Sequence, residues 1–267
     1  MHKRTVLLTL AVAAALLAAT PNGTSAAEEI VCEDQYGGHL QGIAVDGKGA
    51  IFWSFTVELV KTDSAGKVLA RAGVPSHHGD LTWRDGKVFV AVNLGQFNQE
   101  AGKADSWVYV YDDADLLLLS KHEVREVVHG AGGIAYHDGR FIIIGGLPEG
   151  YDVNYAYEYD MSFRFVRRHV LESGYTRLGI QTACYGGGYW WFGCYGFPEN
   201  CALFRADGEF APAGYYDTPA SVGFDMLPDG RFIQGFTGRD ETTGKWWGKA
   251  KLITAEEATG AVFEKKE

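Results

Sequence analysis

The sequence predicts an all-β protein, a five-bladed β-propeller of four-stranded antiparallel blades. Five glycine-containing turn signals each join two short apolar runs, and four of them contain an Asp-Gly pair. Glycine accepts the positive φ that primed hairpin turns require, so each signal indicates a β-hairpin. The hairpins recur roughly every 40 to 50 residues, which is typical of radial repetition, and helical periodicity is nearly absent. The turns lie at residues 46–49, 84–87, 137–140, 186–188 and 228–231.

Residues 1–27 have the features of a cleaved export signal. A basic start of His2, Lys3 and Arg4 precedes an apolar run from Val6 to Ala19, and small residues at 24–27 offer cleavage sites. The run is short for a membrane span, although a retained anchor is the alternative. We therefore expect a secreted or periplasmic protein with no membrane association after cleavage, in which residues 28–267 form a single propeller domain.

Each unit divides into four expected strands. The strands lie at 41–45, 50–55, 57–62 and 67–71 in the first unit, 81–84, 87–92, 107–111 and 116–122 in the second, 133–137, 140–144, 154–159 and 163–169 in the third, 180–185, 189–194, 201–205 and 210–215 in the fourth, and 222–227, 231–236, 248–253 and a weaker 260–263 in the fifth. Residues 30–33 precede the first unit, and we expect them to complete the last blade. Such a clasp would tie the termini together and remove an open edge. At most one helical turn is expected, at 255–258.

The net charge of the chain limits the kinds of partner that it can bind. The formal net charge is −10, and it becomes −12 once Lys3 and Arg4 leave with the signal. Nucleic acid binding needs clustered cations that displace counterions, so no nucleic acid partner is expected. A small-molecule or glycan ligand is expected instead, and the protein is expected to be a monomer.

Four cysteines remain after export. Cys194 ends one expected strand and Cys201 begins the next, so a hairpin would set them nearly opposite each other. An oxidising compartment permits disulfides, and we expect one between these two residues. Cys32 and Cys184 are distant in the blade scheme, and no pairing is assigned to them. Zinc motifs of the CxxC type are absent from the sequence.

Three segments carry a resemblance to a known group. Residues 42–46 read GIAVD, residues 50–54 read AIFWS, and residues 133–137 read GIAYH. In this blade pattern the chain resembles the NHL and SMP-30-like group of repeat propellers. Those relatives usually have six blades or more, against five here, so the resemblance implies a fold and not a function. The lactonase branch of the group binds a divalent metal through Glu, Asn and Asp, and no such trio is matched in this chain.

Connection lengths indicate which face carries function. Connections in a four-stranded blade alternate between two faces, and the long ones gather on one of them, at 93–106, 145–153, 195–200 and 237–247. Ordering a long loop costs entropy, so such loops usually serve binding or catalysis. The segments that lead into the innermost strands reach the same face, and they hold four histidines: His39, His77, His78 and His129. We expect these rings to converge at the mouth of the central funnel.

Two kinds of chemistry suit this set of histidines and their neighbours. In the first, His78 or His129 acts as a general acid or base, with Asp80 orienting the ring and His39 beside it. Propeller lyases that act on uronic-acid polysaccharides use His with Tyr and Arg in a similar way. The expected substrate-binding residues are His77, Gln181, Arg177, Asn93, Tyr195, Tyr151 and Trp247.

In the second chemistry, a divalent metal activates water. Its ligands would be His39, His78, His129 and Asp80. A two-carboxylate glycosidase mechanism is also open in principle, because acids lie in the long loops: Glu149, Asp152, Glu199 and Asp240.

The leading functional hypothesis is a carbohydrate-directed hydrolase or lyase that works outside the cytoplasm. One alternative is a non-catalytic propeller that binds a glycan or a protein. A second alternative is a metal-dependent, lactonase-like esterase. The histidines also have a structural interpretation, in which they hydrogen-bond neighbouring blades and fix their spacing.

Overall fold

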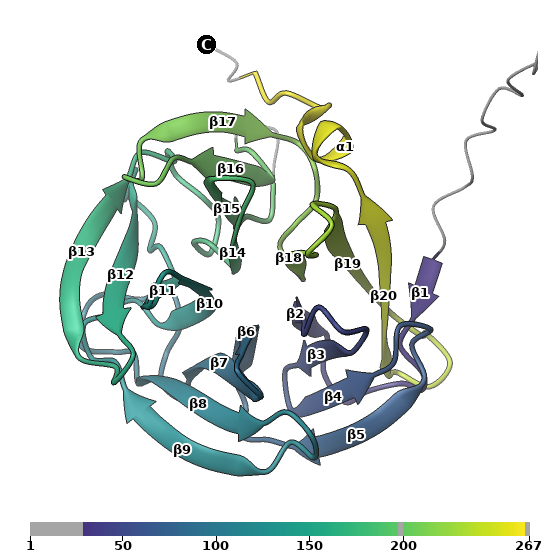
Figure 1. Ribbon diagram of the computed structural model, residues 1–267. Coiled ribbons are helices and arrows are strands. Elements are labelled where there is room, and N and C mark those ends of the chain that lie inside the picture. The colour runs from purple at the N-terminus through teal and green to yellow at the C-terminus, as the bar shows by residue number, and fades with distance from the viewer. Residues whose placement is uncertain (1–28, 197–199, 265–267) are drawn as a thin grey trace, which may run out of the picture.

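Five four-stranded antiparallel sheets surround a central axis (Figure 1). The computed structural model describes residues 29–196 and 200–264 of the chain. The predicted architecture is confirmed. Blade 1 contains β2 (Leu40–Val45), β3 (Ile51–Phe55), β4 (Glu58–Thr62) and β5 (Val68–Gly73), and blade 2 contains β6 (His78–Arg84), β7 (Lys87–Asn93), β8 (Ser106–Asp112) and β9 (Leu118–Glu123). Blade 3 contains β10 (Ala131–His137), β11 (Arg140–Gly145), β12 (Asn154–Asp160) and β13 (Phe165–Leu171), and blade 4 contains β14 (Thr182–Gly186), β15 (Tyr189–Gly193), β16 (Leu203–Ala206) and β17 (Pro212–Tyr216).

Blade 5 joins the two ends of the chain. It contains β18 (Phe224–Met226), β19 (Phe232–Arg239), β20 (Trp246–Ile253) and, as its outermost strand, β1 (Glu29–Val31). β1 pairs with β20 through Glu29 opposite Lys251 and Val31 opposite Lys249. The predicted clasp is therefore present, and the exposed edge of β20 is paired.

The expected strand at 260–263 is wrong. This segment makes an isolated bridge between Val262 and Tyr216 of blade 4, and β1 occupies the outer edge of blade 5. Residues Ala255–Thr259 form the short helix α1, in which Thr254 and Glu257 make a reciprocal capping box. The segment 260–263 therefore follows this helix and lies beside blade 4 rather than in blade 5.

The hydrophobic core lies between the blades. The interface of blades 1 and 2, for example, packs Ala44, Phe52 and Leu59 against Leu81 and Val90. Similar clusters fill the other four blade-to-blade interfaces. The inner strands are buried on both faces, because each blade is covered by a neighbour on either side, so these strands show continuous apolar runs rather than strict alternation.

Two of the four Asp-Gly turns have the predicted backbone of a primed hairpin turn. Asp85 and Gly86 have φ of 48° and 76°, and Asp138 and Gly139 have 46° and 77°. Two successive positive φ values are the mark of a type I′ hairpin turn. These short turns lie on one face of the ring, and the long connections lie on the other.

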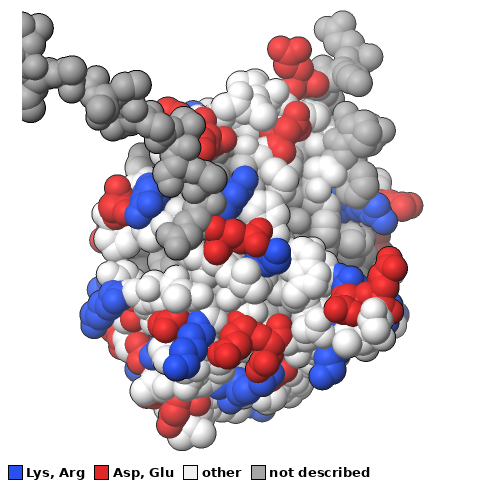
Figure 2. Space-filling view, turned by 90° about the vertical axis from the view of Figure 1, so that its right-hand side faces the viewer, with Lys and Arg blue, Asp and Glu red and all other residues white. Residues whose placement is uncertain are grey.

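Charges of both signs intermix on the outside of the ring, as Figure 2 shows for the side that carries β1 and β20. Arg71 bridges Asp34 and Glu58, and Lys249 bridges Glu29. Within the described residues no helix is long and apolar enough to cross a membrane.

Candidate functional site

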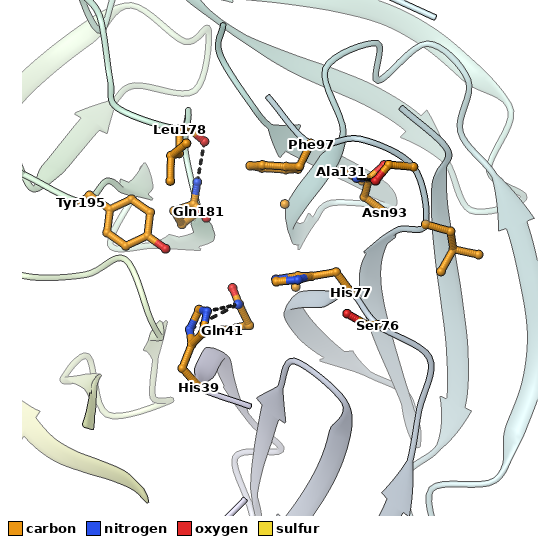
Figure 3. A pocket seen from close by; sticks show the side chains of 14 residues that line it. His39, Gln41, Ser76, His77, Asn93, Phe97, Ala131, Leu178, Gln181 and Tyr195 are labelled. Atoms are coloured by element: carbon orange, nitrogen blue, oxygen red, sulfur yellow. Dashed lines mark hydrogen bonds between the residues drawn. The ribbon is translucent and has the colours of Figure 1, made fainter. Parts of the chain in front are cut away.

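A pocket of about 480 Å³ opens at the centre of the long-loop face (Figure 3). Blades 1 to 4 and two long loops contribute to it. Its lining is His39, Gln41, Ser76, His77, Gly79, Asn93, Leu94, Gly95, Phe97, Ala131, Gly132, Leu178, Gln181 and Tyr195. Within the described residues, the side chains of this lining include imidazole, amide, hydroxyl and aromatic groups and no carboxylate, ammonium or guanidinium group.

Irregular strands place part of this lining. The innermost strands of blades 1, 2 and 3 each shift register near their start, between Leu40 and Gly42, between His78 and Leu81, and between Ala131 and Gly133. A β-bulge bends its strand and redirects a side chain. The inserted positions include Gln41, Gly79 and Gly132, all of which line the pocket. Gln41 was not predicted as a site residue, because a bulge leaves no clear signal in the sequence.

His39 and Gln41 form one unit on the blade 1 side of the pocket. The Gln41 amide nitrogen lies 2.9 Å from His39 Nε2, and His39 Nδ1 lies 3.1 Å from the Leu40 carbonyl oxygen. This pattern fits a neutral ring with its proton on Nδ1, which donates to Leu40 while Nε2 accepts from Gln41. The pair is therefore held in one orientation toward the pocket, as Figure 3 shows.

His77 and His78 point in opposite directions. His77 lines the pocket, with its ring centroid 6.2 Å from that of His39. Enclosure by the pocket walls lowers the pKa of His77, and the nearby His39 ring lowers it further. Among the described residues, the His77 imidazole makes no hydrogen bond to another group of the chain. It is thus a neutral proton acceptor that faces the pocket.

His78 is a structural histidine. It is fully buried, with Nδ1 2.7 Å from the Pro75 carbonyl oxygen and Nε2 2.7 Å from the Tyr111 hydroxyl. Burial lowers its pKa to about 4. The structure therefore places the predicted catalytic His78 inside blade 2, since successive residues of an extended chain face opposite sides.

Phe97 and Tyr195 lie on two sides of the pocket. Phe97 comes from the long β7–β8 loop, and its ring lies so close to Gly132 that a Cβ there would be 3.2 Å away. Tyr195 follows β15, and its hydroxyl is directed into the space between the blades (Figure 3). Burial raises the pKa of Tyr195, so the phenol keeps its proton. Phe97 was not predicted, because nothing in its loop sequence singles it out.

Gln181 and Asn93 were predicted to bind substrate, and both line the pocket. Gln181 donates from Nε2 to the Leu178 carbonyl oxygen at 2.6 Å, which leaves its amide oxygen as an acceptor. Asn93 bonds at both ends to its own loop, to the Gly95 carbonyl oxygen and the Asp105 amide. Gln181 therefore has an acceptor to offer a ligand, whereas Asn93 shapes the loop.

Asp80 does not face the pocket. Its side chain lies beneath Gly79, at the axis, where Oδ2 accepts a hydrogen bond of 3.0 Å from the Ala183 amide of blade 4. Burial raises its pKa well above the ordinary value, which favours the protonated, neutral form of the carboxyl group. Asp80 thus links the innermost strands, and it does not orient His78 or His129 as predicted.

His129 also lies outside the lining. Its Nδ1 is 2.8 Å from the Gln99 carbonyl oxygen, and its ring contacts Tyr151 at 5.2 Å between centroids. Tyr151 in turn donates to Glu100 at 3.0 Å. Both residues therefore fasten the long loop that delivers Phe97.

The four expected metal ligands, His39, His78, His129 and Asp80, are not brought together. Across residues 29–196 and 200–264, no three His, Cys, Asp or Glu side chains are grouped so that they could hold a metal ion. The physical reason is that both nitrogens of His78, Nδ1 of His129 and Oδ2 of Asp80 are hydrogen-bonded to separate parts of the fold.

Two further predicted residues lie apart from the pocket lining. Trp247 belongs to β20, opposite Gly238, because β19 and β20 extend beyond their predicted ends. Arg177 is exposed beside Leu178, and its positive charge acts on Tyr195 by lowering the phenol pKa against the larger effect of burial. Of the loop acids, Glu149, Asp152 and Asp240 do not line the pocket, and Glu199 lies outside the described residues.

The predicted Cys194–Cys201 disulfide is not formed in the structure, where both residues are free thiols. The hairpin register differs from the predicted one, because the Cys194 amide donates to the Ala202 carbonyl oxygen at 2.8 Å. Cys194 is thus opposite Ala202 and diagonal to Cys201, and its thiol donates to the Phe192 carbonyl oxygen at 3.9 Å. Cys32 and Cys184 are buried free thiols.

Comparison with known proteins finds similar structures but does not assign the chain to a family. No family model matches the chain, and no curated protein matches it either. Similar solved structures include a gluconolactonase from Xanthomonas campestris, with 14% identity over 85% of this chain and 89% of that chain and a TM-score of 0.48. Another is BamB from Moraxella catarrhalis, with 11% identity over 80% and 85% and a TM-score of 0.37. In a nidogen/laminin complex the matched chain is 12% identical with a TM-score of 0.41, and the match covers 63% of this chain and 59% of that one.

The five-bladed propeller of the chain itself agrees with the generic part of the predicted resemblance. Its narrower part, membership of the NHL and SMP-30-like group, is not confirmed by any family model.

Proposed function

We propose that the protein acts on a carbohydrate that binds in the central pocket. The observation that carries the proposal is the convergence of His39, Gln41, His77, Gln181 and Tyr195 on one space beside the ring of Phe97. Sugar hydroxyls donate and accept hydrogen bonds, and amide, imidazole and phenol groups can do both. A pocket of about 480 Å³ has the size of ordinary small-molecule sites.

His77 is the proposed acid–base residue. A neutral imidazole that faces the ligand and has no competing hydrogen bond from the described chain can take a proton and return it. Tyr195, which keeps its proton, is available as a donor from another side of the pocket. Hydrolysis and elimination both need such a pair of proton-transferring groups.

A non-catalytic glycan-binding role is the second candidate. Three of the four residues that were expected to be catalytic, His78, His129 and Asp80, lie outside the pocket. The remaining one, His39, is tied to Gln41. Such an arrangement suits recognition as well as turnover. In either role, the export expected from residues 1–27 would bring the site to sugars outside the cytoplasm.

The test combines binding with turnover. Purified protein is screened against neutral and uronic-acid oligosaccharides by calorimetry and by product analysis, together with His77→Ala, Tyr195→Phe and, as a control on the outer strand β9, His122→Ala. We expect His77→Ala to abolish turnover and Tyr195→Phe to weaken binding about tenfold, as expected for a lost hydrogen bond to a ligand. Binding without turnover would establish the second candidate. Saccharide binding that survives every pocket substitution would contradict both.

A further inference from the structure

A second pocket lies at the rim of the ring, beside blade 4, and has one cysteine, Cys201, in its wall. Its volume is about 400 Å³. Its lining comes from four segments: the residues after β13, the residues before β16, the outer strand β17 and the C-terminal segment. The lining residues are Glu172, Ser173, Gly174, Tyr175, Asn200, Cys201, Tyr215 and Phe263. Cys201 therefore forms part of the wall of a space that opens to solvent.

Cys194 lies next to Cys201, deeper in the core between blades 3 and 4. The Cys194 amide donates to the Ala202 carbonyl oxygen at 2.8 Å, and the Cys194 thiol donates to the Phe192 carbonyl oxygen at 3.9 Å. The interaction between the two cysteine side chains lowers the pKa of Cys201 and raises that of Cys194. Cys201 is thus the cysteine of the pair whose ionisation is favoured, and it is also the one that lines the pocket.

The other two cysteines differ in both respects. Burial raises the pKa of Cys32 to about 12, and burial also raises that of Cys184. Neither residue lines the rim pocket. They are internal controls within the same molecule.

We propose that Cys201 and Cys194 form a thiol–disulfide exchange site that small disulfides reach through the rim pocket. The Cys201 thiolate attacks one sulfur of a disulfide RSSR, forms a mixed disulfide with it and releases one thiolate RS⁻. Cys194 loses its proton and attacks the sulfur of Cys201, which forms the Cys194–Cys201 bond and releases the second RS⁻. The two protein thiols are oxidised, RSSR is reduced to two thiols, and the two protons end on these products.

The pocket favours one class of disulfide. Glu172 lines it, Tyr175, Tyr215 and Phe263 add aromatic surface, and the whole chain has a net charge of −10. Like charges repel, so an anionic disulfide should approach more slowly than an uncharged or cationic one. Cystamine, a small cationic disulfide, is therefore the probe.

The experiment treats the reduced full-length protein with cystamine and follows intact mass and cysteine-containing peptides over time. The native protein should lose two hydrogens and link Cys194 to Cys201. Cys194→Ser should instead hold a stable cysteamine adduct at Cys201, because the resolving thiol is gone. In Cys201→Ser, the reaction at Cys194 should be at least about tenfold slower.

Peptide mapping of the unsubstituted protein keeps the test valid even where a serine variant fails to fold. Cys201 should react at least about tenfold faster than Cys32 and Cys184 in the folded protein, and this difference should vanish in denaturant. Equal rates at all four cysteines in the folded protein, or a native protein that stays fully reduced, would overturn the proposal. Because the readout is mass alone, the result does not depend on whether a sugar binds in the central pocket.

Discussion

At the scale of single residues, the direction in which a side chain points determines its role. His77 and His78 are adjacent, yet one faces the central pocket and the other bonds to Pro75 and Tyr111 inside blade 2. A buried ring with both nitrogens bonded supports the fold, because its loss leaves a cavity and an unpaired hydroxyl. A ring that faces a pocket contributes little to the stability of the fold.

The two histidines should therefore differ in stability tests. His78→Ala should lower the free energy of unfolding by about 2–4 kcal/mol, since Tyr111 loses its partner and packing is lost. His77→Ala should change it by less than about 0.5 kcal/mol. Urea unfolding monitored by tryptophan fluorescence measures both. If His77→Ala proved as destabilising as His78→Ala, His77 would be a structural residue and the proposed acid–base role would fail.

His129 should act through a loop. It fixes the β7–β8 loop at the Gln99 carbonyl oxygen, so His129→Ala should free the segment that carries Phe97. We expect limited proteolysis between residues 94 and 105 to accelerate about fivefold or more. Loss of a local contact worth about 1 kcal/mol raises the fraction of molecules in which this loop is open to the protease by about that factor. His137→Ala, on the opposite face, is the control. Asn98 also holds the loop, because its side-chain oxygen accepts from the Leu147 amide at 2.8 Å. Unchanged proteolysis would show that Asn93 and Asn98 hold the loop without help from His129.

At the scale of elements, local signals predicted nearly everything about the blades. An Asp-Gly turn and its flanking apolar runs specify a hairpin within a dozen residues, so most strands were predictable from local signals. The pocket was less predictable. The bulge in β2 places Gln41, and the ends of β19 and β20 remove Trp247 from the site. Both depend on the detailed register of neighbouring strands, which a sequence pattern does not record.

The clasp should be needed for a stable ring. A chain that begins at residue 34 lacks β1 and leaves β20 as an unpaired edge. Exposed strand edges promote association between copies. We expect this chain to unfold at a lower urea concentration than one that begins at residue 29 and to elute partly as oligomers in size-exclusion chromatography. Identical midpoints and elution for the two chains would mean that β1 contributes nothing to closure.

At the scale of the whole molecule, the ring closes around two acids, the buried Asp80 and the half-buried Asp225. Asp80 of blade 2 accepts from Ala183 of blade 4, and Asp225 of blade 5 accepts from Val45 of blade 1 at 3.0 Å. Burial raises the pKa of Asp225 to about 7, and burial together with the nearby Asp225 charge raises that of Asp80 well above its ordinary value. The raised pKa values favour the protonated carboxyl groups in the folded state, whereas the unfolded chain releases these protons near pH 4.

Stability should consequently fall as the pH rises. A carboxyl group with a raised folded-state pKa contributes fully below its unfolded pKa, and its contribution is lost between that value and the folded one. Each such group lowers the free energy of unfolding by about 1.4 kcal/mol per pH unit within this window. For Asp225 the window runs from about pH 4 to about pH 7.

Asp80→Asn should flatten this slope. Oδ1 of Asp80 is buried and has no hydrogen-bond partner in the described part of the chain, so an amide nitrogen can take its place while the oxygen still accepts from Ala183. Urea unfolding monitored upward from pH 4 should show a shallower slope than that of the unsubstituted protein, by up to about 1.4 kcal/mol per pH unit. The exposed Asp152→Asn is the control, and its slope should not change. A slope that Asp80→Asn leaves intact would mean that Asp80 is ionised at the axis, which would require a charge partner for it among the innermost strands.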